Sequence, residues 1–162
     1  RRVLETLREK SDWGNAPEGR FQGVAVMESY GSVCAEVAEV SLVDGRPKVH
    51  KVTAVVDCGE VVNPDIVQAQ LMGAVVYGLS AAMGEKLELT GGAIRQSNFH
   101  DYPLLRMPDA PEVVGFTVRG PDSPTGGIGE VAVPPLAPAV CNALFLATGE
   151  RIRSLPIREH FA

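Results

Sequence analysis

The chain has 162 residues, 45% of them hydrophobic and 22% charged, which is the composition of a globular domain large enough to enclose a core. Its formal net charge is −5 and basic residues form no cluster larger than Arg1–Arg2, so neither nucleic acid nor an anionic membrane surface is favoured as a partner. The longest apolar stretch, around residues 71–84, is interrupted by glycines and is too short to span a bilayer. These totals predict a single domain over residues 1–162.

The cysteines and histidines do not form a metal-ligand pattern. Cys34, Cys58 and Cys141 are widely spaced in apolar segments without a C-x-x-C pair, which favours small buried hydrophobic residues over a metal site. The three histidines have no mutual spacing suited to metal ligation. We therefore predict no metal ligand within this chain.

The first third of the chain predicts one helix and three sequential antiparallel strands. Residues 1–10 have the pattern of a short charged helix. Two β-type runs follow from Phe21, and Tyr30–Ser32 can turn the chain between them. Asp44–Gly45 is a stronger hairpin signal and leads into a third strand over residues 48–57.

A long apolar helix is predicted next. Asn63 suits the N-cap, Pro64 the first helical position and Gly84 the C-terminal stop. The segment between them is apolar on nearly all sides, which indicates a buried helix. Glycine inside a helix costs roughly 1 kcal/mol relative to alanine. Gly73 and Gly78 therefore indicate close approach of another backbone or of a ligand.

Two glutamines are the polar exceptions in this helix. A buried glutamine amide needs a defined hydrogen-bond partner, which can be the main chain or a polar ligand. Gln70 lies three residues before Gly73 and shares its helical face. Gln70 is therefore the better candidate for binding a ligand.

The second half predicts a hairpin around residues 90–92, an extended connection over 98–111 and a strand over 112–119. A loop over residues 120–129 then leads to a helix over 134–148, and residues 151–157 are compatible with a short edge strand. The predicted fold class is α+β, with two main buried helices packed on a mostly antiparallel sheet.

The stretch T-G-G-I-G-E-V-A-V-P-P over residues 125–135 carries the clearest chemical signal. It places one carboxylate, Glu130, directly after a glycine-rich turn and close to the start of a helix. The residues around this position are apolar. A carboxylate held in such a place is suited to accepting a proton. The alternative is a capping glutamate in a Gly/Pro-rich loop. A dinucleotide-binding turn is not supported, because no strand precedes the pattern and prolines interrupt the helix start.

Two motifs together resemble a known family. D-C-G-E-V-V-N-P-D-I-V-Q-A-Q-L-M-G-A-V-V-Y-G-L over residues 57–79 and G-I-G-E-V-A-V-P-P-L-A-P-A-V over 127–140 resemble the molybdenum hydroxylases, the xanthine dehydrogenase and aldehyde oxidase family. The ending A-T-G-E-R-I-R-S-L-P-I over 147–157 is most similar to the molybdopterin-binding large subunit, or beta subunit, of the isoquinoline 1-oxidoreductase type. The resemblance extends over nearly the whole chain, from about Phe21 to Ile157.

The resemblance implies a function and a site. It implies a molybdenum-cofactor-dependent oxidoreductase that hydroxylates an aldehyde or N-heterocycle carbon, with water as the oxygen source. Glu130 would be the general base, and Gln70, Gly129 and Gly127 would contact the molybdopterin. Electrons would leave through an iron–sulfur subunit or domain, because the chain itself has no iron–sulfur cysteine pattern.

The length departs from the family, whose large subunits have many hundreds of residues. The start on Arg1 instead of methionine also indicates a C-terminal portion of a longer chain. We therefore expect the remainder of the large subunit as a partner, and no cofactor bound to the 162-residue chain alone. The alternative is a non-catalytic α+β binding or assembly module that retains the family fold. Neither the substrate nor the compartment follows from the sequence.

Overall fold

The computed structural model describes residues 1–120 and 122–161. Its helices, strands and 3-10 helices follow one another along the chain as α1 (Arg2–Lys10), β1 (Phe21–Ser29), β2 (Ser32–Val43), β3 (Arg46–Asp57), α2 (Pro64–Gly84), β4 (Leu89–Thr90), β5 (Ala93–Ile94), η1 (Met107–Asp109), β6 (Glu112–Thr117), α3 (Leu136–Thr148) and η2 (Ile157–Phe161).

The main sheet has four strands in the order β1-β2-β3-β6. β1, β2 and β3 form two antiparallel pairs joined by tight turns, as predicted. β6 instead pairs parallel to β3, with Lys51 opposite Glu112 at one end and Val56 opposite Thr117 at the other. A parallel pair needs a crossover connection, and α2 lies within it. The α+β class with a mostly antiparallel sheet is confirmed, but the parallel edge was not foreseen.

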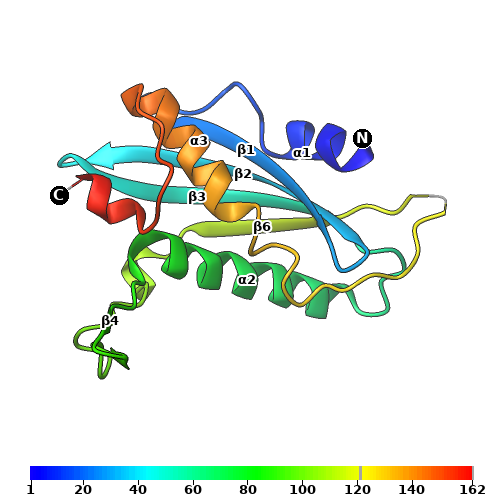
Figure 1. Ribbon diagram of the computed structural model, residues 1–162. Helices are drawn as coiled ribbons and strands as arrows, with labels where there is room; N and C mark the ends of the chain where they lie inside the picture. Colours follow the sequence, from blue (N-terminus) through cyan, green and yellow to red (C-terminus); the bar gives the residue numbers. More distant parts are fainter. Residues whose placement is uncertain (121, 162) are drawn as a thin grey trace.

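Helices cover both faces of the sheet (Figure 1). α2 and α3 lie on one face, where β2 contributes Cys34 and Ala38 to the two larger hydrophobic clusters. α1 lies on the other face, where Ala35 and Val37 pack against Leu7. Successive side chains of a strand point to opposite faces, so β2 is buried without interruption from residue 34 to residue 40.

One ionisable side chain is enclosed in this core. Glu36 lies in the middle of β2, between Ala25 of β1 and Ala54 of β3, and is 0% exposed. The period-two alternation places it on the face covered by α2 and α3, between Cys34 and Ala38. Neither carboxyl oxygen has a hydrogen-bond partner among the residues that the structure describes. Burial raises the pKa of Glu36 well above its ordinary value of 4.5.

α2 begins where its capping signals predict. The Asn63 side chain accepts hydrogen bonds from the backbone N–H groups of Asp65 at 3.0 Å and Ile66 at 3.3 Å. Only part of the helix is buried, however, and Met72 and Tyr77 are among its exposed residues. α2 therefore packs on the sheet as predicted, but its burial is one-sided, because the sheet and α3 cover one flank only.

By length and mean hydropathy alone, α2 would be able to cross a membrane. In this fold, half of its most apolar 18-residue window is buried inside the protein, as is common for a core helix. The statement that the apolar segment is too short to span a bilayer was therefore wrong, because it counted residues 71–84 only, whereas the helix has 21 residues.

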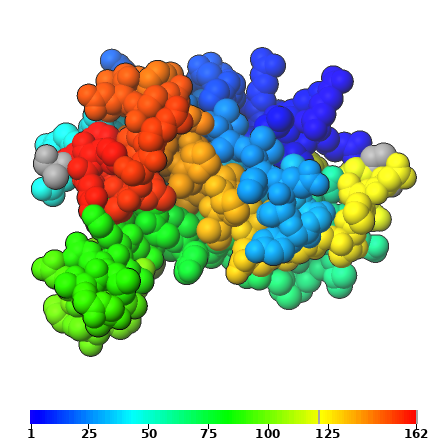
Figure 2. Space-filling view, in the orientation of Figure 1, coloured from blue at the N-terminus to red at the C-terminus, as the bar shows by residue number. Residues whose placement is uncertain are grey.

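α3 begins at Leu136, just after the proline pair, and ends at Gly149, whose φ of 77° is the left-handed conformation expected after a helix. The predicted edge strand over residues 151–157 is absent, and the 3-10 helix η2 follows instead. The predicted hairpin around residues 90–92 forms as β4 and β5, and it projects from the body of the protein (Figures 1 and 2).

Candidate functional site

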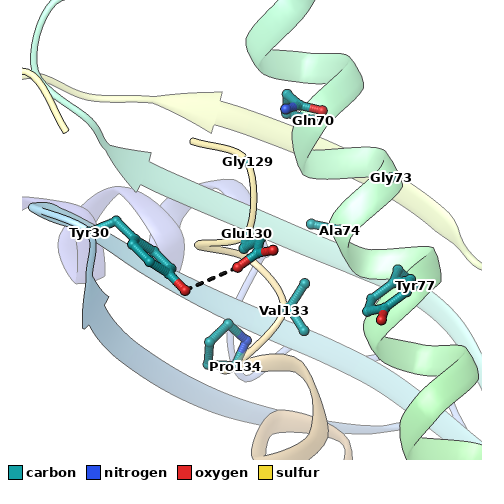
Figure 3. A pocket seen from close by; sticks show the side chains of 9 residues that line it. All are labelled: Tyr30, Gln70, Gly73, Ala74, Tyr77, Gly129, Glu130, Val133 and Pro134. Atoms are coloured by element: carbon teal, nitrogen blue, oxygen red, sulfur yellow. Dashed lines mark hydrogen bonds between the residues drawn. The ribbon is translucent and has the colours of Figure 1, made fainter. Parts of the chain in front are cut away.

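A pocket of about 520 Å³ lies between α2 and the loop that precedes α3 (Figure 3). The residues that line it come from the β1–β2 turn, from one face of α2 and from the segment before α3: Tyr30, Gln70, Gly73, Ala74, Tyr77, Gly129, Glu130, Val133 and Pro134. Three segments far apart in the sequence therefore meet at one site. The volume is in the range of pockets that bind small molecules and cofactors.

α2 presents one helical face to the pocket. Gln70, Gly73, Ala74 and Tyr77 are spaced by three, four and seven positions, which places them on the same side of the helix. A Cβ atom added to Gly73 would contact nothing within 4 Å, so the protein's own packing leaves the space in front of this glycine open. Gly78 differs, since a Cβ there would lie 3.3 Å from the backbone oxygen of Val133. One interior glycine thus serves packing and the other widens the pocket.

The loop that carries Glu130 is held against the β1–β2 turn. Tyr30 accepts a hydrogen bond from the backbone N–H of Gly127 at 2.8 Å, and the Ser32 hydroxyl donates to the carbonyl of Gly127 at 2.7 Å. A Cβ added to Gly127 would lie 2.9 Å from the Cβ of Tyr30, and one added to Gly126 would collide with Gly31 and Ser32. The glycines of this loop are therefore required for its close approach to the turn.

A second anchor holds the start of the same loop. Asp57, the last residue of β3, accepts hydrogen bonds from the N–H of Gly120 at 3.0 Å and from the Ser123 hydroxyl at 2.8 Å. Burial alone would raise the pKa of Asp57, but hydrogen bonds from Ser123, Gly59 and Gly120 lower it below the ordinary range. The loop is thus tied to the sheet at both of its ends.

Glu130 meets a tyrosine inside the pocket. The phenol of Tyr30 donates a hydrogen bond of 3.0 Å to Oε2 of Glu130 (Figure 3). This hydrogen bond, together with the negative charge of the carboxylate, raises the pKa of Tyr30 above its ordinary value of 10.0. The other oxygen, Oε1, makes no hydrogen bond within the described part of the chain, and Glu130 is exposed to the pocket. One carboxylate oxygen is therefore oriented by the protein and the other is free to accept a proton.

The structure brings together three of the four predicted site residues. Gln70, Gly129 and Glu130 all line the pocket, and a Cβ added to Gly129 would lie 3.7 Å from Nε2 of Gln70. Gly127 does not line the pocket, since its N–H and carbonyl are both bonded to the β1–β2 turn. Its role in cofactor binding remains a prediction, and the structure shows that it has a packing role.

The two glutamines of α2 have different surroundings. The Gln68 amide donates to the backbone carbonyl of Gly115 at 2.8 Å, so its partner is the main chain. The Gln70 amide makes no hydrogen bond to any described residue and lies exposed at the pocket. Gln70 was expected to be buried, and its exposure follows from its position on the uncovered flank of α2.

Sequence reasoning missed both tyrosines. Tyr77 could have been found, because it lies seven residues after Gln70 and so shares its helical face. No local motif identifies Tyr30 as the partner of Glu130, because the two residues are 100 positions apart in the sequence.

The pocket has groups that fit part of an oxygen- and nitrogen-rich pterin. The free amide of Gln70 supplies both donors and an acceptor, and the N–H of Gly129 is not used by any described residue. Gly73 leaves room beside them. None of the described residues that line the pocket is a lysine or arginine, so cations for a pterin phosphate must come from outside this site. The residues present therefore fit one flank of such a cofactor.

No group of three or more metal-ligating side chains occurs among the residues that the structure describes. Cys34 and Cys58 are buried free thiols, Cys141 is half-buried, and burial raises the pKa of each. The chain itself therefore offers no assembled metal-ligand set at this site or elsewhere in its described part.

A family model and two related proteins match most of this chain. A family model described as a molybdopterin cofactor-binding domain matches residues 5–111. The chain is 37% identical over 166 residues to the isoquinoline 1-oxidoreductase subunit beta of Brevundimonas diminuta, covering 99% of this chain and 21% of that protein. It is 33% identical over 165 residues to a membrane-bound aldehyde dehydrogenase (pyrroloquinoline-quinone) of Gluconacetobacter polyoxogenes, covering 96% and 21% respectively.

The fold is also that of a solved oxidoreductase. The aldehyde oxidoreductase of Desulfovibrio gigas superposes with a TM-score of 0.65 at 26% identity, over 77% of this chain and 14% of that one. The chain thus spans about a fifth of the length of the curated relatives it matches. From the matched domain and these identities, the chain belongs to the molybdopterin cofactor-binding domain family of the molybdenum hydroxylases.

Proposed function

We propose that this chain forms one flank of the cofactor site in a molybdenum-cofactor-dependent oxidoreductase. The enzyme would hydroxylate an aldehyde or N-heterocycle carbon with water as the oxygen source. The observation that carries the proposal is the convergence of Gln70, Gly129 and Glu130 on one open pocket. The relatives named above are oxidoreductases, and the domain family binds molybdopterin.

Each pocket residue has a definite part in this proposal. When bound, the molybdenum cofactor would supply a two-electron acceptor beside the substrate. Oε1 of Glu130 would take the proton from the water-derived oxygen as that oxygen attacks the substrate carbon. Gln70 and Gly129 would hold the cofactor edge nearest to this carboxylate through the amide and the backbone N–H. Cofactor contact by Gly127 would be limited, given its bonds to the β1–β2 turn.

Redox balance implies a partner. Adding the oxygen of water to a carbon–hydrogen bond releases two electrons and two protons, and the electrons must leave the site. The described part of the chain has no cluster of cysteine ligands, so we assign the electron acceptor to an iron–sulfur subunit or domain. The small-molecule substrate would enter past the exposed Tyr77.

A second proposed partner is the remainder of the large subunit. Large apolar side chains are exposed on α2 and just before it, and on the β4–β5 hairpin and just after it. They include Val62, Ile66, Met72, Leu89 and Phe99. Exposed apolar residues in such number are typical of a surface that another segment covers. That remainder would also bring the cations and additional pterin contacts that the pocket lacks.

The source of the oxygen tests the proposed function directly. The intact enzyme is assayed in ¹⁸O-labelled water, and the hydroxylated product is expected to carry the label. Molybdenum and cofactor analysis accompanies the assay, because one relative is named for pyrroloquinoline quinone. Unlabelled product, or a quinone cofactor in place of molybdenum, would contradict the proposal. If the protein is instead a non-catalytic binding or assembly module, the assay would form no hydroxylated product and the analysis would find no cofactor.

Gln70→Ala in the intact enzyme is expected to lower molybdenum occupancy more than it lowers kcat per bound molybdenum. Removing the amide leaves cofactor polar groups without a partner, at a cost of about 1–3 kcal/mol. The measurement is metal content together with turnover. Gln68→Ala is the matched control, since Gln68 bonds to Gly115 and is directed away from the pocket. Equal losses of molybdenum in both variants would show that helix stability, and not cofactor contact, is responsible.

The 162-residue chain alone is expected to bind molybdenum only at a small fraction of one equivalent. It supplies one flank of the pocket, and no described lining residue is a cation. Elemental analysis after incubation with cofactor measures the occupancy, and circular dichroism confirms that the chain is folded. Stoichiometric molybdenum in the folded chain would contradict this expectation.

A further inference from the structure

The turn between β1 and β2 has an unusual residue at its tip. Ser29 pairs with Ser32, which leaves Tyr30 and Gly31 as a two-residue turn, and both have positive φ values of 54° and 74°. Such turns favour Asn-Gly, Asp-Gly or Gly-Gly, because few side chains tolerate a left-handed backbone. A bulky aromatic residue in this conformation is a source of strain, and such strain is concentrated at functional sites.

The next turn of the same sheet provides an internal comparison. Asp44 and Gly45 connect β2 to β3 with almost the same backbone, at φ values of 51° and 74°. There the chain uses one of the favoured pairs. The tyrosine in the first turn is therefore not required by the turn geometry, and its reason must lie in what the side chain reaches.

The side chain reaches Glu130. The phenol of Tyr30 points into the pocket, where it donates the 3.0 Å hydrogen bond to Oε2 (Figure 3). The backbone of Tyr30 binds the same loop, since its carbonyl accepts from the N–H of Gly127 at 2.8 Å. One residue thus fixes the loop through its main chain and the carboxylate through its side chain.

We propose that Tyr30 is a positioning residue for Glu130, holding Oε2 so that Oε1 is presented to the reacting groups in the pocket. The inference rests on the proposed function of Glu130 as general base. A carboxylate on a loop without this hydrogen bond would sample several rotamers, whereas misplacing a catalytic group by ~1 Å can cost about a hundredfold in rate.

The test is made in the intact holoenzyme. Tyr30→Phe is expected to lower kcat about tenfold with KM and molybdenum content little changed. The matched control is Tyr102→Phe, which removes a comparable hydrogen bond of 2.8 Å, to Glu85, outside the pocket. Equal kinetics in both variants would overturn the proposal.

A second variant separates positioning from folding. Tyr30→Asn suits the turn, so it is expected to raise thermal stability or leave it unchanged while lowering kcat as much as Tyr30→Phe. Full activity in this variant would overturn the proposal.

A double-mutant cycle separates this inference from the function on which it rests. In a Glu130→Gln background, measured in single turnover, Tyr30→Phe is expected to have no further effect, because it acts through Glu130. Fully additive losses would assign Tyr30 a general structural role and overturn the inference alone. Normal turnover of Glu130→Gln by itself would instead overturn the proposed function.

Discussion

Replacing Glu130 with glutamine in the intact enzyme is expected to lower kcat by at least about a hundredfold and to leave the molybdenum content unchanged. General-base catalysis is typically worth about 10²–10⁴ in rate. Glutamine keeps the size of the side chain and can still accept the hydrogen bond from Tyr30, but it cannot accept a proton at neutral pH. The cofactor should remain bound, since its contacts come mainly from other groups.

The measurement compares kcat with metal content in the variant and in the parent enzyme. Glu18→Gln is the control, because Glu18 is exposed in the loop between α1 and β1 and lies outside the pocket. A fall in kcat/KM equal to that in kcat would indicate an interaction made only in the transition state. Near-normal turnover with full molybdenum would show that Glu130 is an ordinary loop residue.

Glu36 is expected to make the stability of the chain depend on pH. Its pKa in the folded chain is raised by burial above the unfolded value near 4.5. As pH rises above that value, the unfolded chain releases a proton that the folded chain retains, so the unfolded state is favoured. The free energy of unfolding should therefore fall from about pH 4.5 upward, until Glu36 also ionises in the folded chain.

Two substitutions test this origin of the pH dependence. Glu36→Gln removes the ionisable group, and its free energy of unfolding should no longer fall across the same pH range. Glu36→Met removes the unpartnered polar group as well, and should stabilise the chain by about 1–3 kcal/mol at pH 7. Urea denaturation of the 162-residue chain at several pH values measures both effects. Glu28→Gln, on the exposed part of β1, is the control for losing one carboxyl.

If the free energy of unfolding depends on pH in the same way in the parent chain and in Glu36→Gln, Glu36 is not the origin of the pH dependence. Cys34 is also titratable and lies two residues before Glu36 in β2, and burial together with the charge at Glu36 raises its pKa. A thiol with a raised pKa stays neutral through the acidic and neutral range, so it does not produce the same effect.

Local sequence signals determined the elements of this fold. The Asn63–Pro64 pair begins α2, Gly149 ends α3, and Asp44–Gly45 closes a hairpin. Each signal acts through hydrogen bonds or backbone angles of adjacent residues, so it can be read without knowing the rest of the chain. The family and the candidate roles of Gln70 and Glu130 also came from the sequence, through two motifs and their order.

The tertiary structure determined the contacts between distant segments, which the local signals do not encode. The parallel pairing of β6 with β3 and the pocket partner of Glu130 depend on segments separated by long stretches of chain. The same is true of the two glutamines, since only the packing of α2 places Gln68 against Gly115 and leaves Gln70 at the pocket. Contacts between residues that are far apart in the sequence form only when the chain packs. Such a contact leaves no local motif or periodicity from which it could be predicted. Tyr30 shows this best, because a residue unfavourable for its turn is explained only by the carboxylate it reaches.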